Sequence, residues 1–277
     1  MLHDENYFTA RDGLRLYEQW WLPEQDPRAV VVVVHGINEH GGRYRRLADD
    51  LTRRGYAVCA MDLRGHGNSD GPRAWIAAFD EYLDDLELLL DRARARQPGK
   101  PLFLLGHSMG GAIIALLGIT RPPSVGGLIL SAPAVLIAGD LFPMLRHVAS
   151  LASRVWPTLR LARMGCRFMS RDPVVVEAFR NDPLVFQGRF PVRTGAEILK
   201  AASRIQVGMK RLTSPLLILH GTGDMVTDPK GSRQLYTRAG STDKTLYLYP
   251  GLYHEVLNEP ERETVLSDLL AWLDRHC

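Results

Sequence analysis

The feature that most constrains the fold is a run of five consecutive valines at residues 30–34. In an extended strand successive side chains point to opposite faces, so this run places apolar groups on both sides of a sheet. Such a strand is stable where helices cover both faces, as in the centre of a parallel sheet. The run leads into a polar, glycine-rich stretch at residues 35–42. Open α/β sheets bind ligands at this position, beyond the carboxyl ends of their strands.

Strands and helices alternate along most of the chain. Apolar runs at residues 57–61, 102–105, 127–131, 215–220 and 245–249 are typical of further buried strands, and amphipathic patterns at 44–54, 79–96, 112–117, 232–239 and 265–273 are typical of helices. Two β-rich runs joined by R-D-G at residues 11–13 predict a hairpin before the valines. We therefore predict an α/β fold with a mostly parallel central sheet, helices on both faces and right-handed crossovers.

The alternation stops between about residues 133 and 210. This stretch has helical stripes and lacks a clear apolar strand, so we predict a helical cap (133–210) inserted into an α/β core (1–132 and 211–277). Its stripe comprises Leu141, Leu145, Val148, Ala152 and Val155, and between residues 140 and 170 a single aspartate accompanies Arg146, Arg154, Arg160, Arg163 and Arg167. We expect the cap to cover the pocket. Its surface also suits peripheral contact with anionic lipid, the alternative being a packed stripe with solvated arginines.

Charge and cysteine content exclude several classes of protein. The chain has 34 Lys and Arg against 31 Asp and Glu, a balance that does not suit nucleic-acid binding. The cysteines at 59, 166 and 277 are far apart, which argues against a disulfide framework and against a zinc site. The polar N-terminus does not resemble a signal peptide, and no apolar run reaches 18 residues. We expect a cytoplasmic protein, with contact at membranes only through the cap, and with no metal or cofactor.

The sequence G-H-S-M-G at residues 106–110 lies between an expected strand and an expected helix. In this context G-x-S-x-G forms a tight strand-to-helix turn, the nucleophile elbow, with Ser108 exposed above the sheet edge in strained backbone geometry. The N–H of Met109 then lies at a helix N-terminus, where it can donate to a developing oxyanion. A second donor is expected in the loop after the valine strand, and we choose the N–H of Ile37.

Two further residues complete a candidate catalytic triad. Asp224 and His254 each follow an expected strand, and parallel strands deliver both side chains to the sheet edge that carries Ser108. The order Ser, Asp, His is that of α/β-hydrolases. A serine hydroxyl is a weak nucleophile, so a histidine must take its proton, and a carboxylate must fix the tautomer of that histidine.

Other ionisable residues in these loops are expected to have local roles. Asp228 precedes a proline, which suits a helix N-cap better than the acid of the triad. Glu255 is expected to point away from the triad, and His107 to pack or bond locally. His35 and His66 are expected to bond within their own glycine loops rather than line the pocket. A metal cluster of His35, Glu39, His40 and Asp62 is not expected, because these residues are spread over two loops and their spacing matches no known metal-ligand pattern.

Four stretches together resemble the monoacylglycerol lipase and lysophospholipase family. They are residues 35–44 (H-G-I-N-E-H-G-G-R-Y), 62–69 (D-L-R-G-H-G-N-S), 106–111 (G-H-S-M-G-G) and 181–184 (N-D-P-L). The resemblance extends over nearly the whole chain, is weakest in the cap, and implies an α/β-hydrolase that cleaves monoglycerides.

The resemblance also implies roles for individual residues. The family's triad matches Ser108, Asp224 and His254, and its oxyanion positions match Ile37 and Met109. Glu39 and Arg43 lie in the loop that the family uses near the glycerol end of the pocket. An apolar tunnel for the acyl chain is expected from the cap residues Leu141, Phe142, Leu145, Phe179 and Val185.

We therefore expect a serine carboxylic-ester hydrolase that converts a monoacylglycerol into glycerol and a fatty acid through an acyl-enzyme on Ser108. A lysophospholipase, a general carboxylesterase or an acyltransferase is the alternative, because the acyl-enzyme is common to all of them. A different class, a non-catalytic ligand-binding protein on a hydrolase scaffold, is disfavoured by the complete triad. Dehalogenases and epoxide hydrolases carry aspartate at the position of Ser108.

Overall fold

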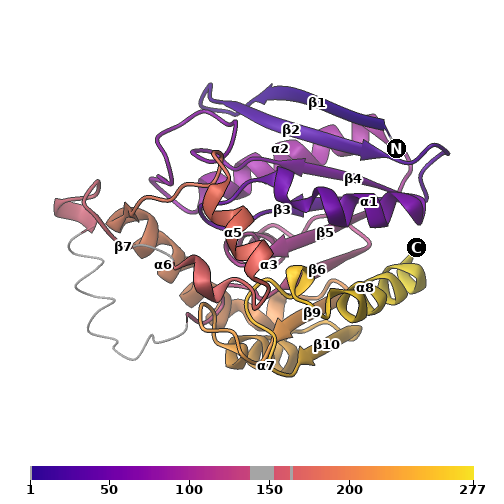
Figure 1. Ribbon diagram of the computed structural model, residues 1–277. Helices are drawn as coiled ribbons and strands as arrows, with labels where there is room; N and C mark the ends of the chain where they lie inside the picture. Colours follow the sequence, from indigo (N-terminus) through magenta and orange to yellow (C-terminus); the bar gives the residue numbers. More distant parts are fainter. Residues whose placement is uncertain (1, 138–152, 163–164) are drawn as a thin grey trace.

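The computed structural model describes residues 2–137, 153–162 and 165–277, and its centre is an eight-stranded sheet (Figure 1). In chain order its strands are β1 (Leu2–Thr9), β2 (Arg15–Leu22), β3 (Ala29–Val34), β4 (Tyr56–Met61), β5 (Leu102–His107), β6 (Gly127–Ser131), β9 (Leu216–Gly221) and β10 (Lys244–Tyr249). Their order in the sheet is β1-β2-β4-β3-β5-β6-β9-β10. β2 runs antiparallel to both of its neighbours, and the other neighbouring pairs are parallel. The predicted, mostly parallel α/β sheet is confirmed.

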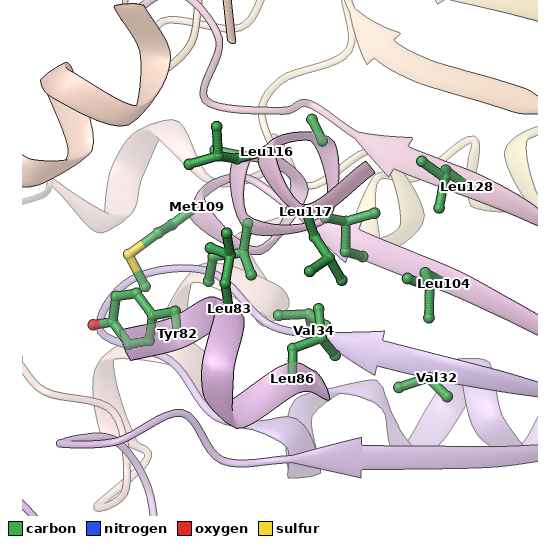
Figure 2. Close-up of a cluster of buried hydrophobic side chains, with 14 of the residues drawn as sticks. Val32, Val34, Tyr82, Leu83, Leu86, Leu104, Met109, Leu116, Leu117 and Leu128 are labelled. Atoms are coloured by element: carbon green, nitrogen blue, oxygen red, sulfur yellow. The ribbon is translucent and has the colours of Figure 1, made fainter. Parts of the chain in front are cut away.

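The valine run forms the centre of this sheet. β3 lies between β4 and β5, parallel to both, and every residue of the strand is fully buried. Its even-numbered valines pack with α2 (Asp80–Arg96) and α3 (Met109–Thr120), and its odd-numbered valines pack with α1 (Arg45–Arg53) and α8 (Arg262–His276). Figure 1 shows α1 and α8 on the near side of the sheet and α2 on the far side. In Figure 2, Val34 lies beside Leu86 of α2. Both faces are covered, as the run requires.

Most element boundaries agree with the predicted ones to within a few residues. The hairpin forms between β1 and β2, with Thr9 paired to Arg15. The helix expected from residue 44 begins at Arg45, after the 3-10 turn η1 (Gly41–Tyr44). α7 (Pro229–Arg238) begins earlier than expected because the Asp228 carboxylate accepts the N–H of Lys230 and caps it. Asp228 therefore has the N-cap role that the sequence predicts.

Between β6 and β9 the described chain is mostly helical. Its elements are β7 (Arg160–Ala162), η2 (Cys166–Phe168), α5 (Pro173–Asn181), β8 (Phe190–Pro191), α6 (Val192–Gly208) and η3 (Met209–Arg211). β7 and β8 pair antiparallel, and strands so short carry no alternation that a sequence pattern can reveal. α6 packs on α3, since Ile198 and Ile205 belong to the same buried cluster as that helix. In Figure 1 this segment lies at one end of the sheet.

The boundaries of the cap, residues 133–210, stay a prediction. Several residues expected in it lie outside the described part of the chain: Leu141, Phe142, Leu145, Arg146, Val148, Ala152 and Arg163. Among the described residues, the helices are too short or too polar for any of them to cross a membrane.

Candidate active site

Ser108 is the single residue between β5 and α3. Its φ of 54° and ψ of −116° lie in a region that residues other than glycine rarely adopt, and the turn is this tight because α3 packs directly on neighbouring backbone. A Cβ atom on Gly110 would lie 2.0 Å from the Val34 carbonyl oxygen, and one on Gly106 would lie 2.5 Å from the Gly110 oxygen. The two glycines of G-x-S-x-G are therefore required by packing, and they leave Ser108 at the carboxyl end of the sheet. There Ser108 is buried, with 5% of its surface exposed, and not exposed as predicted.

Asp224 and His254 lie in the loops that follow β9 and β10, and the structure brings them together. Nδ1 of His254 donates to Oδ2 of Asp224 at 2.7 Å, with both side chains buried. Oδ1 of Asp224 accepts the backbone N–H groups of Val226 at 2.7 Å and Thr227 at 3.0 Å. Burial opposes ionisation of this carboxyl group, but the electrostatic interaction with His254 and hydrogen bonds from His220 and His254 outweigh it and hold the pKa of Asp224 well below its ordinary value.

The second ring nitrogen of His254 has the properties of a base. Because Nδ1–H donates to the carboxylate, Nε2 of the neutral ring carries the lone pair. Nε2 is buried and has no hydrogen-bond partner in the described part of the chain, so the bond to Ser108 Oγ is not formed in this structure. The ring lies against His107, the residue before Ser108, with ring centroids 4.6 Å apart. Catalytic hydrogen bonds of this type often form only in the substrate complex.

A second histidine, His220, shares the Asp224 carboxylate and was not among the residues predicted for the site. Nε2 of His220, in β9, lies 3.1 Å from the same oxygen that His254 contacts, and Nδ1 lies 2.7 Å from Ser232 Oγ on α7. A carboxylate only accepts hydrogen bonds, so Nε2 carries the proton and Ser232 donates to Nδ1. The His220 side chain is fully buried. The signal for it in the sequence is H-G-x-x-D at residues 220–224, which places a histidine next to the last residue of the strand and four residues before Asp224.

The loop after β3 closely approaches the serine. A Cβ atom on Gly36 would lie 3.2 Å from Ser108 Cβ. Nε2 of His35 accepts the N–H of Leu63 at 2.9 Å, which leaves the proton on Nδ1 to donate to the Gly36 carbonyl at 2.7 Å. That carbonyl belongs to the planar peptide group that carries the Ile37 N–H, so His35 sets the orientation of the expected oxyanion donor. Burial keeps the pKa of His35 well below its ordinary value.

A buried ion cluster supports this loop. Arg43 donates to both oxygens of Glu255 at 2.8 Å and to Glu39 at 2.5 Å. Glu39 also accepts hydrogen bonds from the Tyr44 hydroxyl at 3.0 Å and from the N–H of Gly36 at 2.7 Å. Burial opposes ionisation of both glutamates, but Arg43 outweighs it and lowers the pKa of each. The guanidinium of Arg43 lies 4.7 Å from the centre of the Phe179 ring. The expected substrate-binding residues are thus neighbours, although Glu39 and Arg43 direct their polar atoms at protein partners.

The remaining candidates have local roles, as predicted. His66 donates to the Arg64 carbonyl at 2.9 Å and His107 to the Ser131 carbonyl at 3.2 Å. Burial lowers the pKa of each histidine to about 4, and the neighbouring His254 contributes to the shift at His107. Glu255 points to Arg43 and away from the triad. Among the residues that the structure describes, no group of three or more His, Cys, Asp or Glu side chains could hold a metal ion.

A mostly parallel sheet, a strained serine between a strand and a helix, and a bonded aspartate–histidine pair after later strands define a serine hydrolase of the α/β-hydrolase fold. Residues 25–261 match the family described as serine aminopeptidase, S33. The chain is 38% identical to a monoacylglycerol lipase of Mycolicibacterium smegmatis, over 98% of this chain and 97% of the relative. It belongs to this family of serine hydrolases, which includes the monoacylglycerol lipases.

Other relatives agree with this assignment. Human monoglyceride lipase is 36% identical over 98% of this chain and 91% of its own length. The crystal structure of the Paleococcus ferrophilus monoacylglycerol lipase is 30% identical and superposes with a TM-score of 0.84, with both chains fully covered. A soluble variant of the monoglyceride lipase of Saccharomyces cerevisiae, solved with a substrate analogue, is 25% identical, with a TM-score of 0.89 over 100% of this chain and 96% of that chain.

Proposed function

We propose that this enzyme hydrolyses monoacylglycerols, with Ser108 as the nucleophile, His254 as general base and acid, and Asp224 as the carboxylate that orients His254. One observation carries the proposal: Nδ1 of His254 is bonded to Asp224, while Nε2, beside the strained serine turn, has no hydrogen-bond partner among the described residues. The names of the relatives support a monoglyceride as the substrate.

In the acylation step, Nε2 of His254 takes the hydroxyl proton of Ser108 as Oγ bonds to the ester carbonyl carbon. The carbonyl oxygen becomes negatively charged and accepts the N–H groups of Ile37 and Met109. Asp224, which its low pKa keeps ionised, stabilises the imidazolium. The bond from the carbonyl carbon to the glycerol oxygen then breaks, and His254 gives its proton to that oxygen. Glycerol leaves, and the acyl group remains on Ser108.

In the deacylation step, water takes the place of glycerol. His254 removes a proton from the water as its oxygen bonds to the acyl carbon, and the same two N–H groups hold the oxyanion. The bond to Oγ then breaks, and Ser108 recovers its proton from His254. The fatty acid leaves, and the site returns to its starting state.

The charges beside the site favour an ester over a peptide with a free amino terminus. An aminopeptidase needs an acidic group to hold the substrate ammonium, but the buried carboxylates of Glu39 and Glu255 are both paired with Arg43. A neutral glycerol ester needs no such group. We further propose that residues 133–210 form the cap, and that Phe179 and Val185 line the acyl tunnel. Both side chains are buried in an apolar cluster with Met169.

We also propose that the cap contacts lipid peripherally. In the stretch before β7, Val155, Trp156 and Leu159 are respectively 57%, 65% and 43% exposed. Arg160 follows them and donates to two backbone carbonyls, so its charge is not neutralised by those contacts. An exposed apolar group next to a cationic side chain suits an anionic lipid surface. We expect the protein to float with phosphatidylglycerol vesicles and not with phosphatidylcholine vesicles. Equal binding to both kinds of vesicle would reject an electrostatic contribution to lipid contact.

The test of the activity compares monooleoylglycerol, lysophosphatidylcholine and p-nitrophenyl butyrate as substrates of the wild type and of Ser108→Ala. We expect the highest kcat/KM on the monoglyceride, and a loss of about 10⁵–10⁶-fold in kcat for Ser108→Ala. If Ser108→Ala kept the wild-type activity, the assignment of Ser108 as the nucleophile would be refuted. Preference for the lysophospholipid would assign the alternative activity, and ligand binding without turnover by the wild type would assign the non-catalytic class.

A further inference from the structure

Two motif residues that the proposed chemistry does not use, His40 and Asp182, meet in the structure. His40 belongs to the stretch that follows the valine strand, and Asp182 belongs to N-D-P-L, directly after α5. Nε2 of His40 lies 2.9 Å from Oδ2 of Asp182. The His40 side chain is 8% exposed and that of Asp182 is 25% exposed. The contact therefore joins the segment between β6 and β9 to the loop that approaches Ser108.

The partners of His40 determine how this contact is made. The N–H of Gly42 donates to Nδ1 at 3.2 Å, so the proton of the neutral ring is on Nε2 and is donated to Asp182. The other oxygen of Asp182 accepts the N–H of Leu184 at 2.8 Å. Each end of the contact is thus tied to its own backbone, and the link between the two segments has a defined geometry.

A second bond joins the same two segments. The N–H of Phe186, four residues after Asp182, donates to the carbonyl of Asn38 at 2.8 Å. Asn38 has a φ of 68°, in the left-handed region, and its side chain is buried. Backbone strain of this type persists only where the surroundings hold it in place. Asn38 directly follows Ile37, so relaxation of its φ would displace the Ile37 N–H.

We propose that Asp182 is a positioning residue for the oxyanion loop: through His40, and together with the Phe186–Asn38 bond, it holds the strained conformation that presents the Ile37 N–H. This inference rests on the proposed function, in which that N–H stabilises the oxyanion. It predicts that cutting the link lowers the rate of the chemical step more than it weakens the binding of an ester, because the oxyanion develops only in the transition state.

Two substitutions at His40 separate its bond to Asp182 from its bond to the Gly42 N–H. His40→Asn keeps an oxygen that can accept the Gly42 N–H but is too short to reach Asp182. His40→Gln extends an amide N–H to the position of Nε2 and keeps the link. Asp182→Ala cuts the link from the other side, and the double variant His40→Asn with Asp182→Ala tests whether the two residues act as one unit.

The readout is kcat and KM on p-nitrophenyl acetate, whose acyl group is too short to need an apolar tunnel. Complete loss of an oxyanion donor costs ~10²–10³ in kcat, so a displaced donor is expected to cost about tenfold in His40→Asn and in Asp182→Ala, with KM changed by less than about twofold. The double variant is expected to match the singles, and His40→Gln to stay within about threefold of wild type.

A matched control removes a contact that joins the same segment, between β6 and β9, to a different part of the chain, the stretch between β4 and α2. Thr194 Oγ1, on α6, donates to the Ala74 carbonyl at 2.8 Å, away from the oxyanion loop, so Thr194→Val should keep kcat. The inference is overturned if His40→Asn has the wild-type kcat, if His40→Gln is as impaired as His40→Asn, or if Thr194→Val loses as much. Activity in Ser108→Ala would instead overturn the proposed function, so the two failures are distinguishable.

Discussion

Replacement of His35 by phenylalanine tests how the oxyanion donor is held. His35 is fully buried, donates through Nδ1 to the Gly36 carbonyl at 2.7 Å and accepts the Leu63 N–H through Nε2 at 2.9 Å. Phenylalanine has a similar shape and makes neither bond. The substitution therefore frees the peptide group that carries the Ile37 N–H, while the apolar contacts of the ring are largely kept.

The expected magnitudes follow from these two bonds. Each buried backbone group left without a partner costs about 1–3 kcal/mol, so His35→Phe should lower the free energy of unfolding by about 2–6 kcal/mol. Loss of one oxyanion donor costs about 2.7–4 kcal/mol in transition-state stabilisation. We expect kcat to fall about 10²-fold, with little change in KM, because the ground-state ester does not carry the oxyanion.

The assay combines steady-state hydrolysis of p-nitrophenyl butyrate with urea unfolding, and the burst of p-nitrophenol counts the folded active sites. His35→Asn is the matched variant, since its amide N–H can reach the adjacent Gly36 carbonyl while the Leu63 N–H loses its partner. It should keep kcat within about tenfold of wild type, because only the bond that does not orient the peptide group is lost. The reasoning is refuted if His35→Phe retains wild-type kcat per active site, or if His35→Asn loses as much as His35→Phe.

Three further predictions concern charge and titration. His220→Leu removes one hydrogen-bond donor from the Asp224 carboxylate and should lower kcat on p-nitrophenyl butyrate about tenfold. His220→Gln keeps an N–H near the position of Nε2 and should retain most of the wild-type kcat. Equal losses in the two variants would contradict the role of His220 as a donor to Asp224. Arg43→Met leaves two buried carboxylates unpaired and should cost about 3–5 kcal/mol in urea unfolding, and a loss below 1 kcal/mol would contradict their ionised state. His66 and His107 each have a pKa of about 4 in the folded protein, against 6.5 ordinarily. Between pH 6.5 and pH 4 the unfolded chain therefore binds more protons than the folded protein does. The free energy of unfolding should fall as the pH drops through this range, by up to about 1.4 kcal/mol per pH unit for each histidine. Unfolding at pH 4.5, 5.5 and 6.5 measures that slope; His66→Gln should flatten it, and an equal slope in that variant would count against the assignment.

Much of the framework follows from local patterns in the sequence. Five successive valines cannot alternate between an apolar and a polar face, so they require a strand covered on both sides, which β3 is. The glycines of G-x-S-x-G allow β5, Ser108 and α3 to follow one another without an intervening loop. Parallel strands end at the same edge, so the positions of Asp224 and His254 after two of them were enough to predict that these residues lie together. Strand, helix and turn preferences act over a few residues, and a sequence expresses them directly.

The partners of the buried charges were decided only by the tertiary structure. Arg43 and Glu255 are separated by 212 residues, and His40 and Asp182 by 142, so no local pattern relates them. His220 is close to Asp224 in sequence, but its ring contacts both the Asp224 carboxylate and Ser232 only because of the way the loop after β9 folds back. A buried polar or charged group must find a partner because its desolvation is costly, and which partner it finds depends on how distant segments pack.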